Sequence, residues 1–391
     1  MEERKAICRT CEKEFILSVE EQKKFQNLGY ALPTHCKNCR IKRKKDKKCQ
    51  DIKNEKVIAD EYRKKEDKKI SDILSNPKIP IICRNSVYGT PTTLYIIGNG
   101  FDIMHGVNSS YYAFRDFIGK HNVLKEQLET WNIDEDLWAN FEESLAHMND
   151  SAMLDNALDM KNVYGVLDES DDDFSAADFF AATEFAVQPL MDIAYNLPRK
   201  FRNWVKTLKL ESLYLMGEKA MPLRTIINND AMFLSFNYTE FLETLYGVKR
   251  ERIKYIHGMR KIPNFELILG HSNGAEDDYI QEYAEPRYRN QTDHDFYEVV
   301  SQRVAEYYDS TEKKSSEIIK RNQDYFDRLQ SVEQIITIGH SLSKVDYPYL
   351  QEIVSRTNNP YWHVCWYSSA DYTRIIDFAQ KFKVGRIDTF R

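Results

Sequence analysis

The stretch LYIIGNGFDIMHG, Leu94 to Gly106, decides the fold class of this chain. It starts with an apolar, β-branched run that is typical of a fully buried strand. Gly98 and Gly100 then allow a sharp turn before a helical pattern, an arrangement in which a phosphate can approach the amides at a helix amino terminus. The usual dinucleotide fingerprint has a third glycine where this chain has Ile103. The same residues would also suit a tight strand-to-helix turn that holds no ligand.

Strand patterns recur later in the chain, at 231–237, 252–258, 266–272, 333–341 and 362–368. The first four of these run into an asparagine or a histidine where the apolar residues stop, namely Asn237, His257, His271 and His340. Carboxyl ends of parallel strands line the ligand crevice of an open sheet, so these polar ends indicate a shared site. Residues 124–225 have mainly helical patterns. The sequence therefore predicts an α/β fold: a doubly wound, mostly parallel sheet with a large helical insertion at about 124–225.

The bulk composition restricts the class of protein. At 391 residues the chain can form one large domain and a small one. No apolar run approaches the roughly 20 residues of a membrane span, and the first residues, MEERKAICRT, lack the apolar core of an export signal. Seven cysteines, four of them in two C-x-x-C pairs, indicate metal binding in a reducing compartment. We therefore expect a cytoplasmic protein that does not associate with a membrane.

The four paired cysteines predict a zinc site. ICRTCEKEF carries Cys8 and Cys11, and THCKNCR carries Cys36 and Cys39. Each two-residue gap turns both sulfurs toward one ion, and four thiolates suit tetrahedral zinc. Because no coordination position stays open to water, the site should be structural. The segment FILSVEEQKKFQNLGYALPTHCKNCRIKRKK also resembles small zinc-ribbon domains, over about the first 45 residues.

Charge separates the amino-terminal part from the body. Residues 1–80 contain 22 lysines and arginines against 14 acidic residues, whereas the remainder contains 33 against 47. We expect a zinc ribbon at 1–48, a charged helical linker at 49–90 and an α/β domain at 91–391. The basic run RIKRKKDKK, at 40–48, could bind nucleic-acid phosphates or a protein partner, or be a solvated linker. Assembly of several copies is also left open.

Six segments of the body occur in a recognisable order: GNGFDIMHG, WANFEESL (138–145), FNYTEFLE (236–243), IHG (256–258), LILGHS (267–272) and IGHSLSKVD (338–346). Together they resemble the AbiH family of phage abortive-infection proteins over about residues 93–391. AbiH-like chains are in turn similar, more distantly, to the sirtuin-type NAD-binding fold. The resemblance implies an antiphage effector with a nucleotide pocket.

The same resemblance implies roles for individual residues. Asn237 matches the asparagine beside the nicotinamide ribose, and His257 matches the sirtuin general base, so these two are the candidate catalytic residues. Two turns supply the candidate NAD-binding residues, one after the first strand and one in the late Gly-x-Ser segment. These residues are Gly98, Asn99, Gly100, Phe101, Asp102, Gly339, His340, Ser341 and Asp346.

Three departures from the sirtuin pattern change what the resemblance implies. Asp102 stands where sirtuins have a neutral residue, and a carboxylate repels a pyrophosphate unless a cation or helix amino terminus intervenes. It could instead cap the helix, contact a ribose hydroxyl or hold a divalent ion. Thr239 stands where sirtuins usually have an acid. No cysteine pair follows His257, so the sirtuin zinc module is missing and protein deacylation is not expected.

Three classes of function remain after these observations. The leading hypothesis is an effector that binds and hydrolyses NAD, because glycosidic cleavage needs a water-limited pocket, a group that holds the ribose and a base near neutral pH. An amide such as Asn237 and an imidazole such as His257 suit these tasks. The first alternative is a nucleic-acid-directed, metal-dependent nuclease, with the basic ribbon as its nucleic-acid contact and Asp102, Glu142, Asp346 and the histidines as possible metal ligands. The second is a sensor that binds a nucleotide without turnover.

Overall fold

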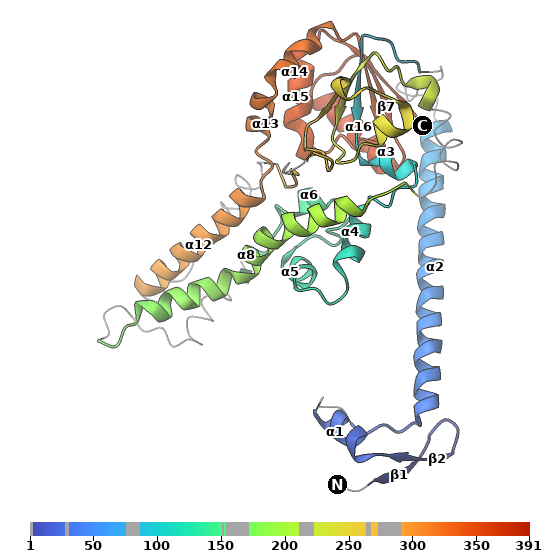
Figure 1. The fold of residues 1–391 in the computed structure, drawn as a ribbon, viewed down its shortest axis with the longest axis vertical. Coiled ribbons are helices and arrows are strands. Elements are labelled where there is room, and N and C mark those ends of the chain that lie inside the picture. Colours follow the sequence, from blue (N-terminus) through green and yellow to red (C-terminus); the bar gives the residue numbers. More distant parts are fainter. Residues whose placement is uncertain are drawn as a thin grey trace. The chain divides into compact units, whose positions relative to one another are not determined.

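The computed structural model describes residues 3–27, 31–75, 87–150, 152–153, 172–210, 223–262, 267–272 and 291–391. Its internal contacts divide the chain into two compact units, Met1–Pro77 and Lys78–Arg391, both drawn in Figure 1. The expected ribbon boundary at residue 48 lies inside one continuous helix, α2 (Lys37–Ser75). Within the described residues, no helix is both long enough and apolar enough to cross a membrane.

The amino-terminal unit is a β-hairpin followed by two helices. Strands β1 (Arg4–Ile7) and β2 (Glu14–Leu17) pair antiparallel, α1 (Val19–Asn27) follows, and the second cysteine pair lies at the start of α2. Among the described side chains of residues 3–43, Cys8 and Leu17 are the buried apolar ones. So small an apolar core gives little stability by itself, and units of this size commonly depend on a metal.

The four cysteine sulfurs of this unit fit a structural zinc site. They all lie within 4.8 Å of one another, and the Sγ atoms of Cys11 and Cys36 are 3.7 Å apart. A tetrahedral zinc with Zn–S bonds of about 2.3 Å places its sulfurs about 3.8 Å apart. Although burial opposes the shift, backbone N–H groups, above all that of Cys36, lower the pKa of Cys8 to about 5, whereas the side-chain hydrogen bond with Cys36 raises the pKa of Cys39 to about 12. A thiolate is the form that binds a metal.

The body contains a six-stranded sheet within the described residues. Its spatial order is β5-β4-β3-β6-β7-β8, and every neighbouring pair is parallel. From β3 the chain builds outward through β4 and β5, then returns to the other side of β3 and builds outward again. This reversal between β3 and β6 is a topological switch point, and the predicted doubly wound sheet is confirmed. The strands are Thr93–Ile97 (β3), Met232–Ser235 (β4), Ile253–Tyr255 (β5), Gln334–Ile338 (β6), Tyr361–Cys365 (β7) and Ile387–Phe390 (β8).

One predicted strand is wrong. Residues 267–270 form no strand, and His271 makes only an isolated bridge with Glu312. The backbone of this segment finds other partners: Ile268 N donates to His257 O at 3.0 Å, and His271 N donates to Thr311 O at 3.1 Å. The segment is therefore held by backbone hydrogen bonds outside the sheet, and Leu267 belongs to the main buried cluster of the body. Conversely, the sequence did not predict β8 at the sheet edge.

Helices fill the connections between the strands. Helices α8 and α12 lie side by side (Figure 1), with Phe179 and Ala186 of α8 in the same buried cluster as Phe296 and Val300 of α12. Between β3 and β4 lie α3 (Asn99–Met104), α4 (Tyr111–Ile118), α5 (Val123–Trp131), α6 (Phe141–Ser144) and α8 (Ala176–Thr207). Later connections contain α10 (Phe241–Tyr246), η1 (Arg250–Arg252), α12 (Gln291–Thr311), α13 (Ser315–Arg321), α14 (Gln323–Asp327), η2 (Arg328–Ser331), η3 (Lys344–Asp346), α15 (Tyr347–Arg356) and α16 (Ser369–Lys381).

The cysteine cluster generates the first prediction. The purified chain should carry a single zinc ion, and Cys8→Ser should abolish it, because three thiolates no longer close the tetrahedron. Cys365→Ser, at a cysteine outside the cluster, is the control and should keep the full zinc content. Metal analysis by mass spectrometry measures both. Equal zinc in wild type and Cys8→Ser would contradict the assignment.

Candidate functional site

A cleft of about 690 Å³ lies at the carboxyl ends of the strands. Its lining includes residues that follow β3, β4, β5, β6 and β7, and it therefore spans the switch point. Cavities of roughly 300–1,000 Å³ are typical of small-molecule sites. The structure brings ten of the predicted body residues to this cleft: Gly98, Asn99, Gly100, Asp102, Asn237, His257, Gly339, His340, Ser341 and Asp346.

Phe101 is the predicted ligand-binding residue that does not line this cleft. Its side chain is 1% exposed and packs against His105 and Tyr246, with ring-centroid distances of 4.5 and 5.7 Å. His105 is held there by a 2.6 Å hydrogen bond to Phe101 O and a 2.7 Å bond to the Tyr246 hydroxyl. Phe101 therefore anchors α3 to α10.

The glycines of the opening motif bring two turns into backbone contact. Gly100 N donates to Gly339 O at 2.8 Å, and Gly98 N donates to Ile338 O at 3.1 Å. A Cβ on Gly98 would lie 2.5 Å from His340 Cα, and one on Gly339 would lie 2.0 Å from Phe101 N. The turn after β3 and the turn after β6 thus need glycine in order to touch. Because these amides already donate within the protein, they are not free to hold a phosphate.

Asp102, Asn237 and Thr239 form a buried polar network beside this contact. Asp102 is 2% exposed, and its two carboxylate oxygens accept from Asn237 Nδ2 at 2.9 Å and from Thr239 Oγ1 at 2.6 Å. Burial raises the pKa of Asp102 to about 7, although both of these hydrogen bonds favour the charged form. Asn237 Oδ1 is buried and has no partner among the described residues. The network therefore holds a titrating carboxyl group and an unused acceptor.

His257 occupies the neighbouring strand end and is 2% exposed. Burial, assisted by the nearby charge of Lys313, lowers its pKa well below the usual histidine value. The ring is therefore neutral, and its Nε2 atom has no partner among the described residues. The unperturbed pKa of histidine suggested a base near neutral pH. In the folded chain the group that titrates there is Asp102 instead.

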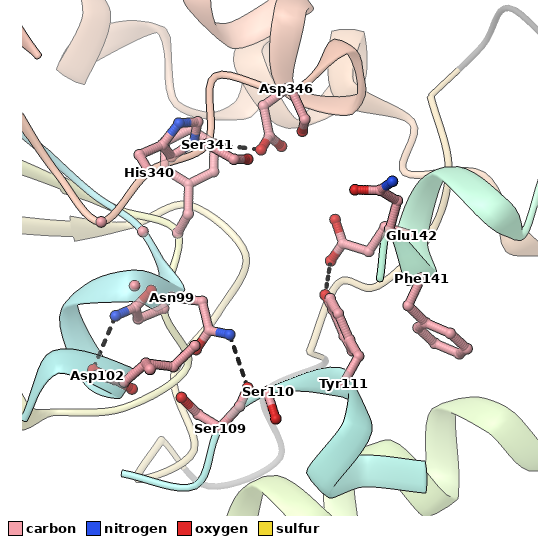
Figure 2. A pocket seen from close by; sticks show the side chains of 18 of the residues that line it. Asn99, Asp102, Ser109, Ser110, Tyr111, Phe141, Glu142, His340, Ser341 and Asp346 are labelled. Carbon is pink, nitrogen blue, oxygen red and sulfur yellow. Dashed lines mark hydrogen bonds and ion pairs between the residues drawn. The ribbon is translucent and has the colours of Figure 1, made fainter. Parts of the chain in front are cut away.

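A chain of polar contacts forms another part of the cleft lining. Lys313, whose side chain is 1% exposed, lies 2.6 Å from Glu142 Oε2 and 3.0 Å from Asp346 Oδ1. Tyr111 donates to Glu142 at 2.8 Å, a contact drawn in Figure 2 together with His340 and Asp346. Although burial alone would raise it, the ammonium of Lys313 holds the pKa of Asp346 well below its usual range. The cluster therefore contains ionised groups in a buried setting.

His340 is oriented by its two ring nitrogens. Leu342 N donates to Nδ1 at 3.1 Å, which leaves the proton on Nε2. Nε2 lies 3.4 Å from Asp346 Oδ2. The ring also packs edge-on against Phe236, with centroids 4.4 Å apart. His340 therefore positions Asp346 and the turn after β6.

Sequence reasoning missed the central cation of this cluster. Lys313 lies 171 residues from Glu142 and 33 from Asp346, and no local pattern joins the three. Tyr111 was also missed, and Thr239 was noted only as a departure. For Thr239 a signal existed, since it stands two residues after Asn237 at the same strand end.

The described residues do not bring Asp102, Glu142 and Asp346 into one group of metal ligands. Glu142 and Asp346 instead share Lys313, whose ammonium occupies the position that a cation would take between them. This geometry does not favour the nuclease hypothesis.

Comparison with known protein families agrees with the architecture of both units. The family model described as "Bacteriophage abortive infection AbiH" matches residues 94–367, and a model described as "Probable treble clef domain" matches residues 2–48. The second match agrees with a cysteine pair that opens a helix. A comparison with curated proteins and one with solved structures found no match.

The backbone contact predicts a large cost for Gly339→Ala. Gly339 has φ +66° and no room for a Cβ, so the substitution should lower the free energy of unfolding by about 3 kcal/mol or more. Gly247→Ala is the matched control, because Gly247 has φ +68° with nothing within 4 Å of a Cβ, and it should cost only about 1 kcal/mol. Denaturant unfolding measures both. Similar costs would show that the turns do not depend on their contact.

The buried cation generates a second prediction for stability. Lys313→Met leaves Glu142 and Asp346 without their shared counter-charge and should cost about 3–5 kcal/mol. Lys320→Met, at an exposed position on α13, should leave the unfolding midpoint unchanged. Thermal and denaturant unfolding of the two variants measure the loss of stability. A Lys313→Met protein as stable as wild type would show that Lys313 does not stabilise the charges of Glu142 and Asp346.

Proposed function

This chain belongs to the bacteriophage abortive infection AbiH family, and from that premise we propose that it binds NAD in the cleft and hydrolyses it. Depletion of NAD would halt the growth of an infected cell and so limit phage propagation. The observation that carries the proposal is the meeting of Asn237 and His257 in one cleft at the switch point, each with a buried polar atom that has no partner among the described residues.

The position and size of the cleft support a nucleotide ligand. Numbered within the sheet alone, the strand order is 3-2-1-4-5-6, the order of dinucleotide-binding sheets. Ligands of such sheets bind outside the carboxyl ends at the switch point. A volume of about 690 Å³ is suitable for a ligand of that class. The glycine turn contributes close packing at this point, and the pyrophosphate needs other donors.

The reaction is the cleavage of the bond between C1′ of the ribose and the nicotinamide nitrogen. The bond pair leaves with nicotinamide, a water oxygen bonds to C1′, and one water proton passes to solvent, which gives nicotinamide, ADP-ribose and H⁺. In this proposal Asn237 Oδ1 orients the water or a ribose hydroxyl. His257, kept neutral by burial, offers a hydrogen-bonding atom without adding charge. Asn237 and His257 are only 5% and 2% exposed, and the burial of these two side chains limits competing water at the reacting centre.

The charges of the cluster around Lys313, in one part of the cleft lining, support the same chemistry. Glu142 and Asp346 carry two negative charges against the single charge of Lys313. An excess of negative charge stabilises the positive charge that develops on the ribose in the transition state, and the low dielectric of a buried site strengthens the effect. The same excess disfavours a phosphate at this part of the lining.

A sensor that binds the nucleotide without turnover would use the same cleft. The orphaned acceptor of Asn237 serves binding equally well, so binding and hydrolysis must be measured separately. Ligand-dependent thermal stabilisation without release of nicotinamide would assign the sensor role.

The proposed hydrolysis can be tested on the purified full chain. Wild type should release nicotinamide from NAD, and Asn237→Ala or His257→Ala should reduce the rate by about a hundredfold or more, because each removes a group at the reacting centre. Asn203→Ala and His121→Ala are matched controls, because both side chains are exposed and neither lines the cleft. Chromatographic detection of nicotinamide measures the rate. Release at the wild-type rate from the Asn237→Ala/His257→Ala double variant would remove the proposal.

A further inference from the structure

We propose that Asp102 is the positioning residue of this cleft: it fixes the side-chain amide of Asn237 with the oxygen toward the ligand, so the cleft recognises a hydrogen-bond donor there. The donor is a ribose hydroxyl or a bound water. The identity of the ligand rests on the proposed function, whereas the orientation of the amide rests on the geometry of the free protein.

Asp102 can orient the amide of Asn237 because an ionised carboxylate only accepts hydrogen bonds. Ionised Asp102 has no proton to donate, so any group bonded to it must donate. Thr239 Oγ1 donates a hydrogen bond to one carboxylate oxygen of Asp102 at 2.6 Å. The other oxygen lies 2.9 Å from the side-chain nitrogen of Asn237, and this nitrogen must face Asp102 because an ionised carboxylate can bond only to a donor. The amide oxygen must then face the opposite way.

The side-chain oxygen of Asn237 determines which ligand group the cleft can recognise at this position. Asn237 is 5% exposed, it lines the cleft, and its Oδ1 atom has no partner among the described residues. A buried acceptor without a partner is unfavourable, so a ligand group that donates to it gains binding free energy. A hydroxyl or a water can donate. A phosphate oxygen at neutral pH has no proton to offer, so this position rejects the pyrophosphate.

Ionisation of Asp102 should control this recognition. With a pKa raised by burial to about 7, the carboxyl group is mostly ionised above that pH and mostly protonated below it. Arg260 favours the charged form, and Glu240 disfavours it. Once protonated, Asp102 can donate to the amide oxygen, and the amide can turn its nitrogen to the cleft. Affinity for a donor ligand should therefore rise as the pH increases through about 7.

Three variants separate positioning from general support of the fold. Asp102→Leu removes both acceptors. Asp102→Asn keeps one amide oxygen for Asn237 and can donate its nitrogen to the Thr239 hydroxyl, so it preserves the orientation without titrating. Thr239→Val removes one bond that favours ionised Asp102 and leaves the bond to Asn237 intact.

The decisive measurement is a double-mutant cycle on the full chain, with ADP-ribose affinity followed by calorimetry across pH. Where the donor is a ribose hydroxyl, Asp102→Leu and Asn237→Ala should each weaken binding about tenfold; where it is a water, both should instead slow the release of nicotinamide. In either case the double variant should be no worse than Asn237→Ala, because Asp102 acts through that amide. Asp102→Asn should bind as wild type but without the change near pH 7, and Thr239→Val should move that change to higher pH. Full additivity of the two losses would overturn the proposal.

A comparison of ADP-ribose with ADP as ligands identifies the group that donates to Asn237 Oδ1. If the donor is a hydroxyl of the second ribose, Asn237→Ala weakens ADP-ribose but not ADP, which lacks that ribose. If the donor is water, Asn237→Ala slows hydrolysis while both affinities stay the same.

A ligand-free measurement keeps this inference distinct from the proposed function. In protein labelled with ¹⁵N-asparagine, the side-chain amide signal that disappears in Asn237→Ala belongs to Asn237. That signal should shift in Asp102→Leu and titrate with pH in wild type. An unchanged signal in Asp102→Leu overturns the positioning role even if NAD is hydrolysed. A shifted and titrating signal in a protein that binds no ADP-ribose supports the positioning role and removes the NAD proposal alone.

Discussion

The body of this protein depends on the backbone contact between the turns that follow β3 and β6. Gly100 N reaches Gly339 O at 2.8 Å, a distance that a side chain at Gly98 or Gly339 would prevent. This contact holds together the ends of the two central strands, β3 and β6, between which the order of strand addition reverses. The cleft opens beside it, and the polar residues at the neighbouring strand ends are held around one space. The glycines thus matter for packing at the site even though their amides are already occupied.

Burial then redistributes the chemistry of the cleft. It moves the pKa of the Asp102 carboxyl up to about 7 and the pKa of the His257 imidazole well below its usual value. As a result, the pKa of the aspartate lies above that of the histidine, the reverse of their usual order. Lys313 has the opposite effect on Asp346, whose charge it stabilises against burial. A cleft with a neutral imidazole, a titrating carboxyl group and ionised carboxylates can order water and stabilise positive charge.

The sequence predicted those features that local patterns encode. The parallel sheet follows from short apolar runs, and the gathering of Asn237 and His257 follows because parallel strands end at one edge. The sequence also predicted the cysteine cluster, because metal-ligand spacing is local. The motif order of the body predicted the family, and the family comparison confirms it.

The features that sequence reasoning missed are those that long-range contacts decide. The apolar segment at 267–270 looked like a strand, but Ile268 N donates to His257 O and the following His271 N donates to Thr311 O. Strand β8 has only two apolar residues, Ile387 and Phe390, around a polar pair, which is too weak a pattern to recognise. Lys313 shows no sign in its own neighbourhood that it will be buried between two carboxylates from distant elements. The pKa of Asp102 likewise depends on burial that no sequence pattern reports.

We expect the cleft at the switch point to accept a nucleotide with its ribose at the end of β4. An experimental structure of the chain crystallised with ADP-ribose tests it most directly. We expect density for the ligand between the turns after β3 and β6, with a ribose hydroxyl or an ordered water within hydrogen-bond distance of Asn237 Oδ1. Ligand density elsewhere on the protein, or a cleft that stays free of ligand at saturating ADP-ribose, would contradict it.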